Sequence, residues 1–240
     1  MRRLIAAFVV ALATLTAVAL PAGGKDDVLA PPRRILLIGD SVMGEVAAAA
    51  EAATAGRATI DYVLTIGTAN VKDDWWDVWP RVVARDQPDD VVVLVGPWEI
   101  DRPDLGSASW ASWYGGRLDR WAGALRAGGA SLHWMTALPT RDAVGAAKLN
   151  VVNGAFRSAA SANGADVVDS AGALGSPGYV ERSATGERLR RIDGLHLCPA
   201  GAAALASALL ADLHVPVTPG WEHGEWAHAG PAYSAEECPA

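Results

Sequence analysis

A run of four apolar residues, 35–38, passes directly into Gly39-Asp40-Ser41 and then into an alanine-rich stretch. This order predicts a buried strand that turns sharply into a helix. A second run, residues 90–95, carries four valines and is the most apolar of its kind in the chain. Strands of a parallel sheet that is covered on both faces read as continuous apolar runs of this sort. The pattern therefore predicts a parallel sheet buried between helices.

The same strand-to-helix pattern recurs along the chain. We expect strands at residues 35–38, 59–64, 90–95, 131–135 and 166–169, and helices at 44–55, 74–85, 109–127, 149–162 and 199–212. Strands that alternate with helices form right-handed βαβ units. The expected fold is an α/β three-layer α/β/α sandwich with a five-stranded, mostly parallel sheet.

Length and composition fit one soluble domain. The chain has 240 residues, about half of them apolar and a fifth charged, which is ordinary for a globular protein. The formal net charge is −7, and no basic patch is visible. We therefore expect no nucleic-acid partner. A dinucleotide site is also disfavoured, because the first strand–helix turn lacks the Gly-x-Gly-x-x-Gly pattern.

The first 22 residues have the features of an export signal. Met1-Arg2-Arg3 is followed by an uncharged apolar stretch over residues 4–20, with small residues at possible cleavage points after Ala19 and Ala22. An uncleaved membrane anchor is the alternative, since about 17 apolar residues reach the lower limit of a spanning helix. Both alternatives predict a secreted or otherwise extracytoplasmic protein, with residues 23–32 as a linker.

Export changes what the two cysteines imply. In an oxidising compartment an even pair favours a disulfide, so we expect Cys198 to pair with Cys238. That bond would tether the C-terminal tail, residues 214–240, to the rest of the domain. The alternative is one buried and one exposed thiol.

Two blocks at opposite ends of the predicted domain carry a family resemblance. Gly39-Asp40-Ser41-Val42 follows the first strand, and Asp193-Gly194-Leu195-His196 precedes the last helix. Together they resemble the SGNH (GDSL-type) hydrolase superfamily over residues 33–213. The resemblance implies a flavodoxin-like SGNH fold and a catalytic domain that spans those residues.

The resemblance also assigns roles to three side chains. Ser41 would be the nucleophile, His196 the base that removes its proton, and Asp193 the group that orients the imidazole. Without the resemblance, Asp40 or Ser41 could simply cap the following helix, and His196 could cap the last one.

The expected oxyanion hole departs from the family pattern. Gly67 fits the family glycine after the second strand, but Trp98 stands where the family has an asparagine. Asn70 or Asn153 could supply the missing donor, or the enzyme could be slow, since one lost donor costs about 10²–10³ in turnover. Glu99 could bind a substrate hydroxyl or lie at the surface.

Ten tryptophans against two phenylalanines are a biased choice of aromatic residue. Trp121 and Trp134 fit the core, whereas Trp98, Trp110 and Trp113 lie near the loop after the third strand and could face a sugar. His133 fits a hydrogen-bonded core histidine. The histidines and glutamates of residues 221–228 match no metal-ligand spacing, so we expect neither a metal nor another cofactor.

These observations predict an exported serine esterase that acts through an acyl-serine intermediate. Its expected substrates are small O-acyl groups, such as acetyl, on envelope or extracellular glycans, with possible association with membrane or envelope machinery. O-acyl transfer to a glycan hydroxyl is one alternative. A non-catalytic glycan-binding protein on the same scaffold is another, because of Trp98. The sequence does not indicate an oligomeric state.

Overall fold

A computed structural model describes residues 31–65, 75–228 and 236–239, and the described residues from Pro32 onward belong to one compact unit. The predicted signal peptide and nearly all of the predicted linker lie outside the described residues. The order of elements is β1 (Arg33–Gly39), α1 (Ser41–Thr54), β2 (Ala58–Leu64), α2 (Trp75–Asp86), β3 (Asp90–Leu94), η1 (Pro97–Asp101), α3 (Ala108–Leu125), β4 (Ser131–Met135), α4 (Ala143–Asn163), β5 (Asp166–Val168), α5 (Ser170–Ala173), α6 (Pro199–Asp212), η2 (Trp221–His223) and η3 (Glu225–His228).

The sheet has five parallel strands in the order β2-β1-β3-β4-β5. This is the flavodoxin-like order, in which the chain direction across the sheet reverses between β1 and β3. The predicted three-layer α/β/α fold is confirmed. In such sheets ligands bind outside the carboxyl ends of the strands at the reversal point, and Ser41 follows β1 at that place.

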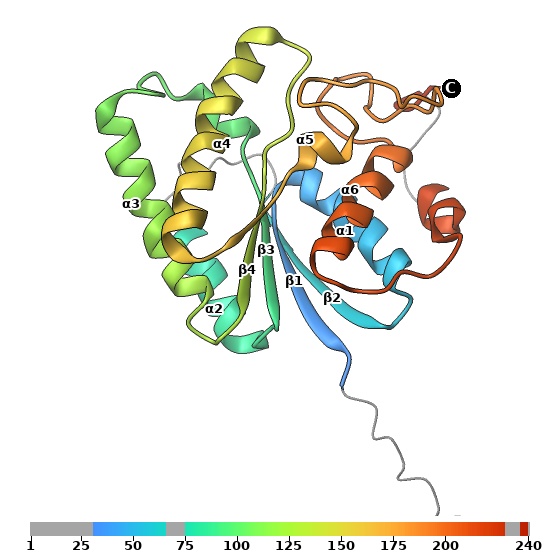
Figure 1. Cartoon of the computed structure of the whole chain (residues 1–240), viewed down its shortest axis with the longest axis horizontal. Helices are drawn as coiled ribbons and strands as arrows, with labels where there is room; N and C mark the ends of the chain where they lie inside the picture. The colour runs from blue at the N-terminus through green and yellow to red at the C-terminus, as the bar shows by residue number, and fades with distance from the viewer. Residues whose placement is uncertain (1–30, 66–74, 229–235, 240) are drawn as a thin grey trace, which may run out of the picture. The chain divides into compact units, whose positions relative to one another are not determined.

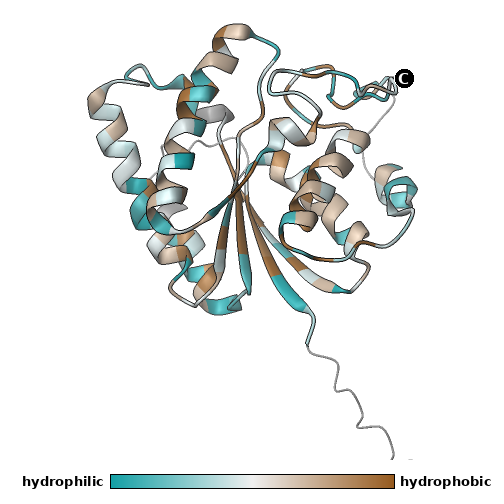
Figure 2. Cartoon of the chain, in the orientation of Figure 1, coloured by the Kyte–Doolittle hydropathy of each residue, from teal (hydrophilic) through white to brown (hydrophobic). Residues whose placement is uncertain are grey.

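Helices cover both faces of the sheet. α1 and α6 lie on one face, and α2, α3 and α4 lie on the other (Figure 1). Alternate residues of β1 supply the two cores: Ile35 and Leu37 pack with α1 and α6, whereas Leu36 and Ile38 pack with α2, α3 and α4. The apolar colouring is concentrated in the strands and on the helix faces toward them (Figure 2).

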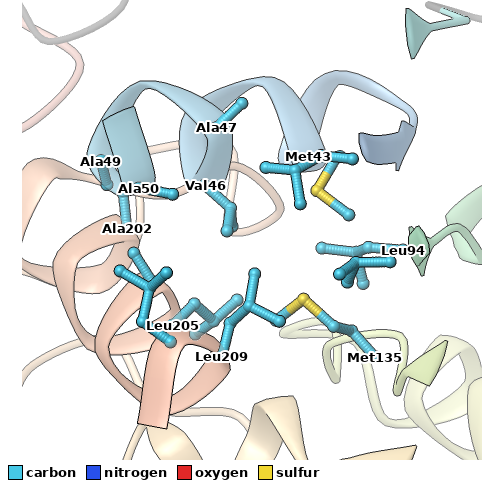
Figure 3. Close-up of a cluster of buried hydrophobic side chains, with 14 of the residues drawn as sticks. Met43, Val46, Ala47, Ala49, Ala50, Leu94, Met135, Ala202, Leu205 and Leu209 are labelled. Atoms are coloured by element: carbon cyan, nitrogen blue, oxygen red, sulfur yellow. The ribbon is translucent and has the colours of Figure 1, made fainter. Parts of the chain in front are cut away.

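Small side chains let α1 and α6 approach each other closely. The labelled side chains of α1 face those of α6, with Leu94 of β3 and Met135 of β4 beside them (Figure 3). Ala49, Ala50 and Ala202 are fully buried in this layer. The contact matters for function because α1 begins with Ser41 and α6 follows the segment that carries His196.

Two helices begin three or more residues earlier than the sequence expectation, whereas the other helix boundaries differ by at most two residues. α1 begins at Ser41 rather than at residue 44, because Asp40 caps it and its Oδ1 accepts the Val42 N–H at 3.0 Å. α4 begins six residues earlier than expected, where the Asp142 carboxylate accepts the Gly145 N–H at 2.6 Å.

The segment after α6 packs on the domain. Trp221 is buried in the core beside α1 and α6, and the Thr218 N–H donates to the Ala53 carbonyl at the end of α1. Cys198 and Cys238 form a disulfide, as the sequence predicts, and the Ile192 N–H donates to the Glu237 carbonyl nearby. Within the described ranges no helix has the length and apolarity needed to cross a membrane.

His133 is a buried, hydrogen-bonded histidine of β4, as expected. Its Nδ1 lies 3.0 Å from Asp212 Oδ2 and its Nε2 lies 3.4 Å from Asp90 Oδ1. Asp90 is also paired with Arg33 at 2.5 Å. This cluster lies at the amino-terminal ends of the strands, at the edge of the sheet opposite Ser41.

Candidate active site

The junction between β1 and α1 places Ser41 at the first position of the helix. Gly39 is required there, because a Cβ at this position would lie 2.3 Å from the Leu94 carbonyl oxygen and 2.5 Å from Met43 Cβ. The buried Asp40 carboxyl then starts the helix. Burial raises the pKa of Asp40 to about 6, although the Val42 N–H bond lowers it. Ser41 itself stays partly exposed.

The structure brings Ser41, His196 and Asp193 together. His196 Nε2 lies 2.8 Å from Ser41 Oγ, and His196 Nδ1 lies 2.6 Å from Asp193 Oδ2. A neutral imidazole can therefore carry its proton on Nδ1, held by Asp193, and offer the Nε2 lone pair to the serine hydroxyl. This is the arrangement that activates a serine as a nucleophile.

Asp193 is held as a carboxylate. Burial by itself would raise its pKa, but hydrogen bonds from the His196 ring and from the backbone N–H groups of Leu195 and His196 outweigh it, so the pKa lies below its usual value. Those two N–H groups lie 2.8 and 3.0 Å from Asp193 Oδ1. The same carboxylate therefore fixes the loop and the imidazole.

Glu45, which sequence reasoning missed, joins the nucleophile helix to the histidine loop. It lies one turn after Ser41 and is only 6% exposed. Its Oε2 accepts the Leu197 N–H at 2.7 Å, and its Oε1 accepts from the Arg191 guanidinium. The single charged residue within the apolar stretch 42–50 was the available signal.

Arg190, also missed, anchors the same loop to the sheet. The side chain is fully buried and donates to the carbonyl of Leu195 at 2.6 Å and to the carbonyl of Pro139, after β4, at 2.9 Å. Burial lowers its pKa to about 10, so the group remains protonated at neutral pH. The Arg190-Arg191 pair just before Asp193 was the sequence signal for these anchors.

Most of the expected oxyanion hole is not described. Gly67 and Asn70 lie outside the described residues, and for Trp98 only the backbone, within η1, is described. Glu99 is 1% exposed, so the surface alternative for it is wrong. Asn153 is not a substitute donor, because its amide binds both the N–H and the carbonyl of Ala137, at 2.7 and 2.9 Å.

Two of the three tryptophans considered for sugar binding do not offer an open face. Trp110 is buried and stacks on Tyr114. Trp113 is half-buried, and the guanidinium groups of Arg102 and Arg117 lie 4.0 and 4.8 Å from its ring centre. Both indoles therefore stabilise the layer that contains α3. Trp121 and Trp134 lie in the core, as expected.

A cavity of about 440 Å³ adjoins the acidic end of this site. It is lined by Ile100, Asp101, Thr140, Arg141, Asp142, Asp193, Gly194 and Leu195. The lining comes from the segments after β3 and β4 and from the histidine loop. Pockets of this size take small organic ligands. The described residues hold no group of three or more histidine, cysteine or acidic side chains arranged to bind a metal.

The sheet order and the arrangement of Ser41, His196 and Asp193 define an α/β protein with the SGNH-hydrolase fold. The chain belongs to the family described as "Protein of unknown function (DUF459)", whose model matches residues 34–212. A search of curated protein sequences finds no match.

Solved structures of hydrolases share this fold. An α/β hydrolase, LAE5, from the metagenome of Lake Arreo in Spain is 20% identical with a TM-score of 0.59, covering 76% of this chain and 95% of that one. A putative SGNH hydrolase from Slackia heliotrinireducens is 19% identical with a TM-score of 0.54, covering 76% and 99%. The acetyl xylan esterase Axe2 from Geobacillus stearothermophilus, in a variant form, is 16% identical with a TM-score of 0.57, covering 78% and 97%.

Proposed function

We propose that this protein is an exported serine ester hydrolase that works through an acyl-Ser41 intermediate. The observation that carries the proposal is the chain of short contacts from Ser41 Oγ through the His196 ring to Asp193. His196 Nε2 takes the hydroxyl proton while Oγ attacks the ester carbonyl carbon. The protonated imidazole then gives that proton to the departing alkoxide, and the Oγ–carbonyl bond remains as the acyl-enzyme.

Deacylation repeats these steps with water. His196 removes a proton from the water as its oxygen attacks the acyl carbon, and the proton returns to Ser41 Oγ when the C–Oγ bond breaks. The N-terminus of α1 supports the negative charge on the carbonyl oxygen. In its first turn the Val42 and Met43 N–H groups interact with the Asp40 carboxyl, and the Gly44 N–H donates to the Asp40 carbonyl. The Ser41 N–H is therefore the proposed donor.

The proposed substrates are small O-acyl groups, such as acetyl, on glycans outside the cytoplasm. The cavity beside Asp193 offers Thr140, Arg141 and Asp101 to a polar leaving group. Axe2, which shares the fold, is an acetyl xylan esterase. The Cys198–Cys238 disulfide supports an oxidising compartment, which fits residues 1–22 as an export signal. We also propose that the protein associates with membrane or envelope machinery.

Acyl transfer is the second candidate. The half-exposed site would admit a sugar hydroxyl as well as water to the acyl-Ser41 carbonyl. The His196 base would activate either acceptor in the same way. The two outcomes differ only in which oxygen accepts the acyl group.

The test is the hydrolysis of p-nitrophenyl acetate by residues 23–240, measured beside Ser41→Ala and His196→Ala. We expect activity in the parent and its loss in both variants, together with an acetyl adduct on Ser41 in mass spectra of quenched reactions. Adding acetylated and free oligosaccharides then separates hydrolysis from transfer by the acetylated product formed. Equal activity in all three proteins would favour the non-catalytic binding protein. Absence of activity in all three, while each still binds glycan, would favour it as well.

A further inference from the structure

Glu45 has no role in the proton transfers described above, yet it is a buried carboxylate next to them. It lies four residues after Ser41, so the two side chains point to the same side of α1. The neighbouring helix positions that are buried carry apolar side chains, such as Val46 and Ala49. A charged group at this place requires a specific partner.

Both carboxylate oxygens are used on the segment that carries the histidine. Oε2 accepts the Leu197 N–H at 2.7 Å, and Oε1 accepts from Arg191. Arg191 returns to the same segment: its Nε donates to the Leu197 carbonyl at 3.3 Å, and its backbone N–H donates to the His196 carbonyl at 2.9 Å. The residue that follows His196 is thus bound at its N–H by Glu45 and at its carbonyl by Arg191.

This arrangement carries a cost in stability. Burial raises the pKa of Glu45 to about 7, although the Leu197 N–H and the charge of Arg191 lower it. The charged groups that face Glu45 are Arg191, His196 and Asp193 from the histidine loop, with Arg190 also acting on it. In the unfolded chain the Glu45 carboxyl has its lower, ordinary pKa and ionises more easily than in the folded protein. Keeping it ionised in the fold at neutral pH therefore lowers the free energy of unfolding. An apolar side chain here would avoid this cost, but could not bind the loop.

We propose that the Glu45 carboxylate, with Arg191, is a positioning group that holds the His196 ring at Ser41 by fixing the backbone of Leu197 to the first turns of α1. The proposal rests on the proposed ester hydrolysis. α1 carries both the nucleophile and this carboxylate, so one rigid helix sets the distance between Ser41 Oγ and His196 Nε2. A misplacement of about 1 Å at such a pair can cost about 10²-fold in rate.

The kinetic test compares Glu45→Gln with Glu51→Gln, which removes an exposed carboxylate from the same helix. At pH 8.5 we expect kcat of Glu45→Gln for p-nitrophenyl acetate to fall about 10²-fold with little change in KM, and Glu51→Gln to match the parent. The ratio of parent kcat to Glu45→Gln kcat should fall as the pH drops through about 7, where the parent carboxyl gains a proton. A kcat of Glu45→Gln within about twofold of the parent at pH 8.5, or a penalty that falls on KM alone, overturns the proposal.

A second readout needs no activity. In the Ser41→Ala background, adding Glu45→Ala removes the acceptor of the Leu197 N–H, so hydrogen exchange at that amide should accelerate about tenfold or more. Exchange in β3 should stay unchanged and serves as the internal reference for global stability. If the parent hydrolyses no ester, the proposed function fails while this experiment still decides the role of Glu45. If exchange is unchanged at the Leu197 amide and also in β3, the proposed positioning role of Glu45 is overturned.

Discussion

His196 Nε2 lies 2.8 Å from Ser41 Oγ, although 155 residues separate the two side chains in the sequence. Three separate connections hold this distance. Glu45 and Arg191 bind the histidine loop to α1, Arg190 binds it to the segment after β4, and Asp193 holds the imidazole itself. The pair therefore depends on side chains that take no part in covalent chemistry.

Asp193 is expected to contribute through the tautomer and orientation of His196. In Asp193→Asn the side chain could donate to Nδ1, which would move the imidazole proton to Nε2 and leave no lone pair for Ser41. We expect kcat for p-nitrophenyl acetate to fall about 10²–10⁴-fold. Glu51→Gln, which changes an exposed carboxylate near the far end of α1, is the control. Activity of Asp193→Asn within about twofold of the parent would contradict the assignment.

The disulfide is expected to stabilise the domain. Closing a loop with a sequence separation of 40 residues stabilises a protein by about 3–4 kcal/mol. The double variant Cys198→Ala/Cys238→Ala should therefore unfold at lower urea concentration. Reductant should lower the midpoint of the parent to a similar value and leave the double variant unchanged. An unchanged midpoint in the reduced parent would show that the disulfide contributes nothing to stability.

His133 is expected to make stability depend on pH. Burial lowers its pKa, but bonds to Asp90 and Asp212 outweigh burial, so the folded pKa lies above the usual 6.5. Because the folded state binds this proton more tightly, the stabilisation is fully present below pH 6.5 and is lost as pH rises through the folded pKa. His133→Gln should be less stable than the parent below pH 6.5, with the difference narrowing at higher pH in urea midpoints. The exposed His223→Gln should follow the parent at every pH; a constant gap for His133→Gln would refute the linkage.

Alanine substitutions at Gly39 and Gly116 are expected to change the free energy of unfolding in opposite directions. Gly39→Ala places a Cβ against the Leu94 carbonyl and Met43, so β1, β3 or α1 must shift, at a cost of about 1–3 kcal/mol. Gly116→Ala, on an open face of α3, has no atom within 4 Å and should stabilise by about 0.5–1 kcal/mol. Chemical denaturation measures both. Equal effects of the two substitutions on stability would contradict the close approach of Leu94 and Met43 to Gly39. The shift that Gly39→Ala forces should also displace Ser41.

Local patterns were enough for the fold. Continuous apolar runs mark the two central strands β1 and β3, and the boundaries of β4 and α6 match the expected residues. The parallel pairing within the sheet agrees with the expectation from alternating elements, and the strand order agrees with the flavodoxin-like fold that the family resemblance implies. The ends of α1 and α4 differed because single side chains, Asp40 and Asp142, cap them, and capping depends on rotamers that periodicity does not reveal.

For the candidate site, the sequence by itself determined the residue types and the positions at strand ends, because a serine after a buried strand and an Asp-x-x-His block have local signatures. Beyond the catalytic trio and the disulfide, which the family resemblance and the cysteine count indicated, only the tertiary structure decided which distant groups meet. The binding of Glu45 to Leu197 spans 152 residues, and Arg190 reaches Pro139 across 51. The same packing turned Trp110 into a core residue and committed Asn153 to Ala137. Such choices depend on burial and on the competition for hydrogen-bond partners, which exist only once the layers have assembled.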